Sequence, residues 1–132
     1  MKAVIDTNVF VSSLINARGI PRRIIDLWKT GEITLCVSKE ILEEYIEVIV
    51  RVFPDDPEPD ELLTLFGKRA NMIFAASLPK INAVKDDPSD DKFIECAVAA
   101  GAGYIISGDI HLRNLKSYSG IKIVSPAEFL SR

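Results

Sequence analysis

The stretch KAVIDTNVF (residues 2–10) joins a short apolar run to a polar turn, and it carries the strongest indication of the fold. Lys2 to Ile5 is apolar enough for a buried strand, because a short apolar run that ends at turn-forming residues is typical of strands. The Asp6-Thr7-Asn8 that follows offers side chains able to cap a helix that begins near Val9. The N-terminal segment therefore predicts a strand, a turn and a helix.

The same alternation of apolar runs and helical patterns continues along the rest of the chain. Further strands are predicted at residues 33–37, 81–84, 104–107 and 121–124. Helices are predicted from Pro21 to Gly31, Ser38 to Pro54, Asp60 to Ala76, Lys92 to Ala100, Ile110 to Lys116 and Pro126 to Leu130. Strands that alternate with helices pair in parallel through right-handed crossovers. We therefore expect an α/β fold, a three-layer α/β/α sandwich with a mainly parallel central sheet, in one domain over residues 1–132.

Composition narrows the function classes that the chain can serve. With 48% hydrophobic and 27% charged residues, the composition is typical of a globular protein with a hydrophobic core. No apolar run approaches the roughly 20 residues that a helix needs to span a bilayer. The N-terminus does not resemble a signal peptide, and Cys36 and Cys96 lie far apart in apolar segments, so we expect reduced thiols and a cytoplasmic protein. His111 is the one histidine, which excludes mechanisms that need two imidazoles. Carboxylates remain as the chemistry to inspect.

Acidic residues follow the predicted strands at the edge where such folds bind ligands. Asp6 follows the first strand, Asp109 follows the strand at residues 104–107, and Asp90 and Asp91 open a helix. Each acid taken alone is better explained as a helix cap or turn residue, a role that contributes roughly 1 kcal/mol. Their shared location at the strand ends reverses that judgement. Asn8 and Ser107 are expected to support these acids by local hydrogen bonds.

A fourth acid is expected from the helix that begins after Ser38, which carries four glutamates. At about 100° per residue, Glu44 lies roughly 115° from the centre of the apolar stripe, and the other three lie farther from it. Glutamates on the far side of an amphipathic helix usually form a solvated face. Glu44 is therefore the one glutamate of this helix assigned to the site.

Several ionised carboxylates cannot crowd together unless a cation cancels their repulsion. Oxygen ligands of this kind suit Mg²⁺ or Mn²⁺. Such an ion activates water and stabilises charge on a leaving oxygen, so phosphodiester hydrolysis is the expected chemistry. Lys92 and Arg113 are candidates for contacts to phosphate.

Four segments together resemble the PIN-domain family: VIDTNVF (residues 4–10), the helix that carries Glu44, DPSDDKFIECA (residues 87–97) and ISGD (residues 106–109). The resemblance covers nearly the whole chain. It is nearest to the PIN proteins that serve as toxin components of toxin–antitoxin systems, the VapC-type ribonucleases.

This resemblance implies a Mg²⁺- or Mn²⁺-dependent endoribonuclease whose metal-binding acids are Asp6, Glu44, Asp90 or Asp91, and Asp109. It also implies an RNA substrate, an antitoxin protein as partner and a homodimer. Between Asp90 and Asp91 the sequence leaves the choice open, with Asp91 taken as the catalytic member. Many relatives have one more acid where this chain has His111, which removes a fifth carboxylate.

Two other doubly wound families with acids at strand ends fit less well. A phosphoacceptor receiver domain needs an acid adjacent to Asp6, and a haloacid-dehalogenase-like phosphatase needs an aspartate where this chain has Asn8. The main alternative is a PIN fold that binds RNA or a protein without cleaving, since a fold does not fix function.

Overall fold

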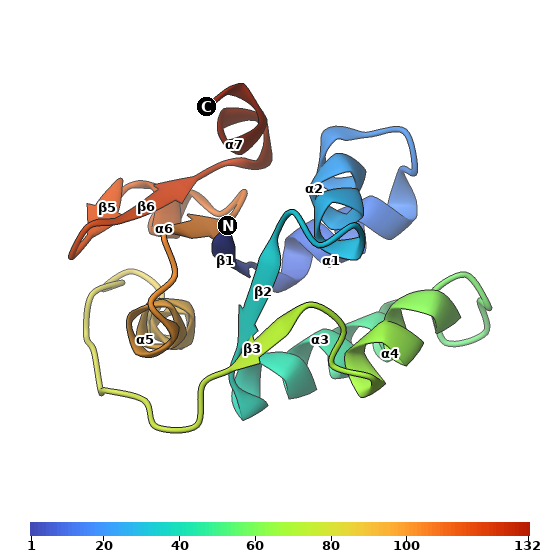
Figure 1. Ribbon diagram of the computed structural model, residues 1–132, viewed down its shortest axis with the longest axis horizontal. Coiled ribbons are helices and arrows are strands. Elements are labelled where there is room, and N and C mark those ends of the chain that lie inside the picture. Colours follow the sequence, from blue (N-terminus) through green and yellow to red (C-terminus); the bar gives the residue numbers. More distant parts are fainter.

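The computed structural model describes residues 1–132 and has a mixed, mainly parallel six-stranded sheet with helices on both faces (Figure 1). The strands are β1 (Lys2–Ile5), β2 (Thr34–Val37), β3 (Met72–Phe74), β4 (Tyr104–Ile106), β5 (Ser117–Tyr118) and β6 (Ile121–Val124). They lie in the order β3-β2-β1-β4-β6-β5, and only β5 is antiparallel to its neighbour. The predicted α/β fold with a mainly parallel sheet is confirmed.

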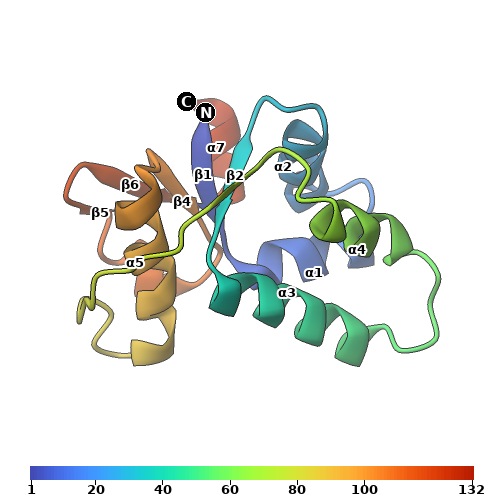
Figure 2. The same ribbon diagram turned by 60° about the horizontal axis from the view of Figure 1, so that its bottom comes forward.

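Seven α-helices and one 3₁₀ turn connect these strands. They are α1 (Thr7–Ile15), α2 (Ile20–Lys29), α3 (Lys39–Val52), α4 (Asp60–Gly67), η1 (Pro88–Asp90), α5 (Asp91–Ala100), α6 (Ile110–Arg113) and α7 (Pro126–Ser131). Helix α5 packs against β1, β2 and β4, and α3 and α4 extend to one side as an arm beside α1 and α2 (Figure 2). None of these helices has the length and apolar character needed to cross a membrane.

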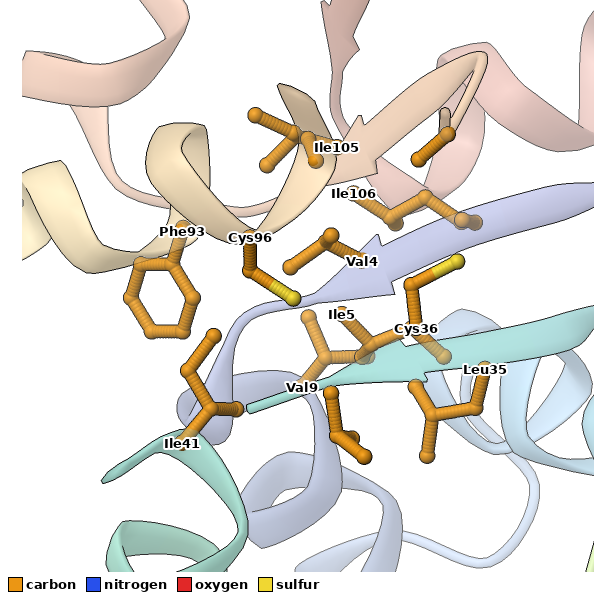
Figure 3. Close-up of a cluster of buried hydrophobic side chains, with 14 of the residues drawn as sticks. Val4, Ile5, Val9, Leu35, Cys36, Ile41, Phe93, Cys96, Ile105 and Ile106 are labelled. Carbon is orange, nitrogen blue, oxygen red and sulfur yellow. The ribbon is translucent and has the colours of Figure 1, made fainter. Parts of the chain in front are cut away.

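The core is densest around the two central strands, where every residue from Ala3 to Ile5 is fully buried. Burial on both faces is what a parallel sheet between two helical layers requires. Figure 3 shows Cys96 of α5 and Cys36 of β2 among the aliphatic side chains of this core. Burial raises the pKa of both thiols, that of Cys96 to about 12. The two cysteines are therefore reduced, buried packing residues, as the sequence predicted.

An aromatic cluster joins α1 to the helical arm. The rings of Phe10 and Tyr45 lie 4.6 Å apart between centroids, and Phe66 contacts both, so α1, α3 and α4 pack as one unit. The Tyr45 hydroxyl donates a hydrogen bond to the carbonyl oxygen of Ile5, the last residue of β1. This contact fixes α3 against the strand end where Asp6 follows.

The predicted helix from Asp60 to Ala76 is wrong in its second half. Helix α4 ends at Gly67, and Arg69 and Asn71 adopt positive φ angles of 52° and 48°, which a right-handed helix does not allow. The chain then turns into β3, which pairs in parallel with β2 at the edge of the sheet. The apolar residues 72–74 belong to this strand.

The strand predicted at residues 81–84 is also wrong, because this segment pairs with no other strand. Its backbone N–H groups donate instead to carboxylates of α5. Ile81 donates to Glu95 at 2.9 Å, and Ala83 and Val84 donate to Asp91 at 2.9 and 2.8 Å. The segment is largely apolar, but its backbone N–H groups bond to side chains rather than to a neighbouring strand. The short β5 was not predicted.

Candidate metal centre

The acids predicted at the strand ends come from four separate segments that meet beside β1 and β4. The two strands pair in parallel with Ile5 opposite Ile106, so Asp6 lies next to the chain that leads to Asp109. The backbone N–H of Asp6 also donates to the carbonyl oxygen of Ile106 at 2.9 Å. Parallel pairing therefore brings together two acids that are far apart in the sequence.

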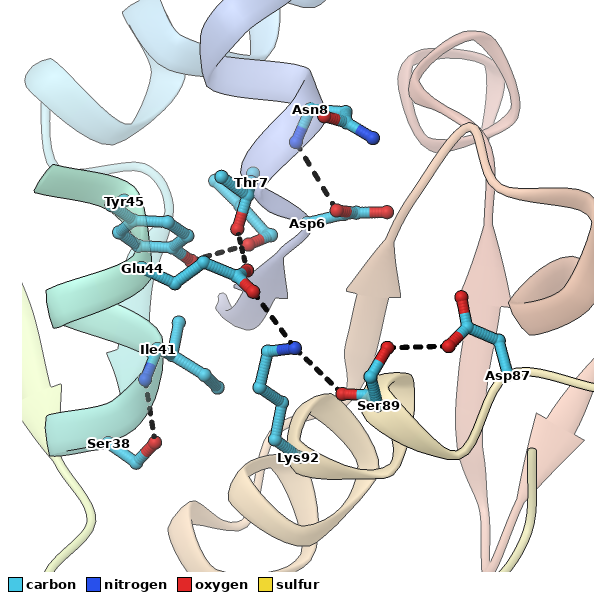
Figure 4. Close-up of polar contacts among 11 residues, drawn as sticks. Asp6, Thr7, Asn8, Ser38, Ile41, Glu44, Tyr45, Asp87, Ser89 and Lys92 are labelled. Atoms are coloured by element: carbon cyan, nitrogen blue, oxygen red, sulfur yellow. Dashed lines mark hydrogen bonds and ion pairs between the residues drawn. The ribbon is translucent and has the colours of Figure 1, made fainter. Parts of the chain in front are cut away.

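Asp6 is 5% exposed, and hydrogen bonds fix both of its carboxylate oxygens. Its Oδ1 accepts from the backbone N–H of Asn8 at 3.2 Å and so caps α1, and its Oδ2 accepts from the Ser107 hydroxyl at 2.6 Å. Burial raises the pKa of Asp6, the two hydrogen bonds lower it, and the charges of Asp109 and Glu44 raise it further. Asp6 is thus both a helix cap and a member of the acid cluster (Figure 4).

Ser107 connects Asp6 to Asp109. Besides donating to Asp6, its hydroxyl oxygen accepts the backbone N–H of Asp109 at 2.9 Å. Ser107 is fully buried, so this bridge is shielded from water. Ser107 makes local hydrogen bonds of the predicted kind, whereas Asn8 contacts Asp6 through its backbone N–H and its side chain is exposed.

Glu44 is half-buried, while Glu40, Glu43 and Glu47 are exposed, in agreement with the angular argument from the sequence. The Glu44 carboxylate faces the cluster, where the Thr7 hydroxyl donates to Oε2 and the Lys92 ammonium lies 3.0 Å from Oε1. Both oxygens of Glu44 therefore have partners within the protein.

Lys92 is a buried cation inside this acidic region, with its side chain 8% exposed. Its ammonium donates to the carbonyl oxygen of Ser89 at 2.7 Å in addition to pairing with Glu44 (Figure 4). A buried charge is costly unless it is paired and hydrogen-bonded, and Lys92 has both kinds of partner. Lys92, which the sequence suggested for contact with phosphate, is thus already paired with Glu44.

Asp90 is the acid whose charge the protein itself does not compensate. The residue is 8% exposed, and its Oδ2 is buried without a hydrogen-bond partner. Carboxylate oxygens of Asp90, Asp87 and Asp109 all lie within 4.8 Å of one another. Burial, a hydrogen bond shared with Asp109 and the charges of Asp87, Asp6 and Asp109 together raise the pKa of Asp90 to about 7.

Asp91 takes a different role from that of its neighbour. Its Oδ1 accepts the two backbone N–H groups of Ala83 and Val84, so this oxygen holds the 81–84 segment against α5. The two adjacent aspartates thus have different contacts, because the Asp90 carboxylate lies in the acid cluster and Asp91 Oδ1 anchors the neighbouring loop. Sequence reasoning missed Asp87, since an acid beside Pro88 looks like an ordinary solvated turn residue.

Two further residues lie on the far side of Asp109. The backbone N–H of His111 donates to Asp109 Oδ1 at 2.8 Å, and its exposed ring lies 3.8 Å from Asp86. Arg113, the other candidate for phosphate contact, pairs with Glu128 at 3.7 Å.

The raised pKa of Asp90 makes a prediction for the protein without metal. The folded state binds this proton more tightly than the unfolded chain, in which the carboxyl has its ordinary pKa of 3.8. The free energy of unfolding should therefore fall as the pH rises from about 4 to about 7, and Asp90→Asn should flatten this fall. Urea unfolding in EDTA across this range measures it, with the exposed Asp55→Asn as control. A wild-type stability that rises over the same interval would contradict the assignment.

Comparison with known sequences agrees with the geometry of this cluster. The sequence model of the PIN domain matches residues 2–111, which include every acid of the carboxylate cluster. The chain is also 34% identical to an uncharacterized protein of Methanocaldococcus jannaschii, over 98% of this chain and 90% of the relative. PIN domains are generally nucleases that use divalent metals, and the carboxylate cluster at the strand ends fits such a metal site. The chain therefore belongs to the PIN domain family.

Proposed function

We propose that this protein is a Mg²⁺- or Mn²⁺-dependent endoribonuclease that hydrolyses phosphodiester bonds of RNA at the carboxylate cluster. The observation that carries the proposal is the unpartnered, buried oxygen of Asp90 among Asp87, Asp6 and Asp109. An ionised acid in this position lacks a compensating charge, and a divalent cation would supply it. PIN nucleases bind RNA, which gives the substrate class.

The donor set fits a hard divalent cation, because it consists of carboxylate oxygens and includes neither sulfur nor imidazole. Asp87, Asp90 and Asp109, whose carboxylate oxygens lie within 4.8 Å of one another, would hold the ion, and Asp6 is close enough to raise the pKa of Asp90 and to contribute a further oxygen. When bound, such an ion lowers the pKa of water and stabilises negative charge on the leaving oxygen of a phosphodiester.

The remaining polar residues would fix the geometry of the reaction. Ser107 holds Asp6 and the backbone of Asp109 in one arrangement, so the two acids do not have to be ordered when substrate binds. Thr7 and Lys92 hold Glu44 in the same way from the other side. We assign Glu44 to orienting the attacking water, because its half-buried carboxylate faces the cluster and Thr7 and Lys92 hold its two oxygens in place.

One observation favours the alternative function, a PIN fold that binds RNA or protein without cleaving it. Lys92 already neutralises Glu44, so the cluster has one acid fewer that requires a metal. The two functions differ in a measurable way, because a binding module needs neither the metal nor the carboxylate of Asp90.

Metal dependence separates these functions and also tests the choice between the adjacent aspartates. RNA cleavage should require Mg²⁺ or Mn²⁺ and cease with EDTA. Loss of a residue that only hydrogen-bonds to a metal ligand weakens metal binding roughly 10- to 100-fold. Asp90→Asn removes a proposed ligand and should weaken Mn²⁺ binding by more than this. Asp91→Asn should leave Mn²⁺ binding nearly unchanged, since the amide oxygen can still accept from Ala83 and Val84. Calorimetric titration with Mn²⁺ and a gel assay with labelled RNA provide the two readouts.

Undiminished cleavage by pure protein in EDTA would rule out the metal mechanism. Equal loss of Mn²⁺ affinity in both variants would instead mean that Asp91 also contacts the ion.

The four glutamates of α3 provide a matched series for the role of Glu44. Replacing each by Gln should preserve the helix, because Glu and Gln have similar helix propensities. Glu44→Gln should lower metal-dependent cleavage by orders of magnitude, whereas Gln at positions 40, 43 and 47 should change it little because those side chains are exposed. Single-turnover cleavage rates measure the effect. Similar rates in all four variants would remove Glu44 from the mechanism.

We further propose that the nuclease is the toxin of a toxin–antitoxin pair, acts in the cytoplasm and forms a homodimer. Support for the toxin role is the resemblance of the motifs around Asp6, Glu44 and Asp109 to the toxin components of such systems. Support for the dimer is an apolar strip on the outer face of α3, where Ile46 and Val50 are 38% and 50% exposed one helical turn apart. Large contiguous apolar patches mark protein–protein contacts, and we propose this strip as the part that α3 provides to such a contact.

The toxin role predicts that induced expression of the protein arrests bacterial growth and that Asp6→Asn abolishes the arrest. Viable counts after induction measure this outcome, and immunoblotting of the variant controls for its abundance. Co-expression of the neighbouring reading frame should restore growth if its product is the antitoxin. If cells that contain the wild-type protein degrade their RNA but still grow normally, the toxin role is contradicted and the nuclease function is retained.

A further inference from the structure

A cleft begins immediately beyond Asp109 and runs between α6 and β6. It has a volume of about 410 Å³, and its polar lining comes from Arg113, Asn114, Lys116, Lys122 and Glu128. Figure 1 shows α6 next to β6, at the end of the segment that leaves β4. None of the acids of the metal cluster lines this cleft.

The cleft concentrates positive charge on a chain whose net charge is −3. Its lining holds three cationic side chains and one carboxylate. Four other clefts of the structure have linings that are neutral or negative in net charge. A local excess of positive charge on an acidic protein is the electrostatic pattern that attracts a polyanion.

The cations of this cleft are available to a ligand. Lys116 and Lys122 are exposed and take part in no ion pair. The pair of Arg113 with Glu128 is long, at 3.7 Å, and the buried Nε of Arg113 has no hydrogen-bond partner. An anionic oxygen would satisfy this donor, and a planar guanidinium suits phosphate oxygens.

The cleft is also close to the proposed site of cleavage. Asp109 caps α6, and the backbone N–H of Arg113 donates to the Asp109 carbonyl oxygen at 3.0 Å. One turn of helix, about 5.4 Å along its axis, therefore separates the acid from the first cation of the cleft. A strand with a phosphate at the acids can place its neighbouring phosphates beside α6.

We infer that the cleft between α6 and β6 binds the phosphate backbone of the RNA strand next to the bond that is cut. The inference rests on the proposed ribonuclease function for the identity of the ligand. RNA fits better than an acidic peptide because the cations follow directly from a metal cluster suited to phosphodiesters. Contacts of this kind position the strand without reading its sequence.

The test measures binding of a short fluorescein-labelled single-stranded RNA by anisotropy at several salt concentrations. An Asp6→Asn background with Mg²⁺ present keeps the RNA intact, which a denaturing gel verifies. Adding Lys116→Gln and Lys122→Gln should weaken binding severalfold and reduce the salt slope by about 0.7 for each phosphate that the protein no longer neutralises. Adding Arg51→Gln and Lys68→Gln changes the net charge equally at exposed positions on the helical arm, and should leave the slope unchanged.

A variant that makes the cleft more positive, and should therefore strengthen RNA binding, makes the test more stringent. Glu128→Gln removes the one carboxylate of the cleft, and Gln can replace Glu in the capping box that Glu128 forms with Ser125. This variant should bind the RNA more tightly than its parent. A poly-glutamate competitor should displace the RNA only weakly.

The inference is overturned if the lysine variants keep the parental affinity and slope, or if poly-glutamate displaces the RNA at lower concentration than unlabelled RNA does. This failure can be told apart from failure of the proposed function. Metal-dependent cleavage with unchanged binding in the lysine variants would remove the cleft and keep the nuclease. Loss of binding in those variants, in a protein that never cleaves RNA, would keep the cleft as a binding site and remove the nuclease.

Discussion

The parallel pairing of β1 with β4 is the constraint on which the site depends. The register that sets Ile5 opposite Ile106 places Asp6 and Ser107 at one edge of the sheet, where a 2.6 Å hydrogen bond joins them. Ser107 then fixes the backbone of Asp109. A shift of one residue in this register would turn Asp6 to the other face of the sheet, because successive side chains alternate. The buried residues of both strands make such a shift costly.

The protein balances its crowded acids unevenly. Glu44 receives a buried cation and a hydroxyl, and Asp6 receives two hydrogen bonds. The buried Oδ2 of Asp90 has no hydrogen-bond partner, although other carboxylates lie around it. Because an unpaired buried charge costs free energy, this arrangement fits the binding of a divalent cation. Hydrogen bonds and an ion pair fix the positions of Glu44 and Asp6, whereas Asp90 is the acid that a metal ion would neutralise under the proposed function.

Much of this arrangement could be predicted from the sequence because it depends on local patterns. The strand before Asp6, the helix that carries Glu44 and its angular position, and the strand before Asp109 all follow from short-range periodicity. The sequence could not separate the roles of Asp90 and Asp91, because the side chain of either adjacent residue at a helix start can point toward the acid cluster. The decisive contact of Asp91 is with Ala83 and Val84, which only the folded chain brings close. The same contact explains why the apolar segment at 81–84 was wrongly predicted as a strand, and Asp87 was missed because its neighbours suggest only a turn.

The two buried thiols in the core have a consequence for the kinetics of the protein. The thiolate is the reactive form of cysteine, and burial raises the pKa of both Cys36 and Cys96. Alkylating reagents should therefore reach them only when the central sheet opens. Because Cys36 lies on β2 and Cys96 on α5, their labelling rates report separately on a strand and on the helix packed against it. Equal rates would mean that the sheet and its covering helix open as one cooperative unit, and unequal rates would show which layer separates first.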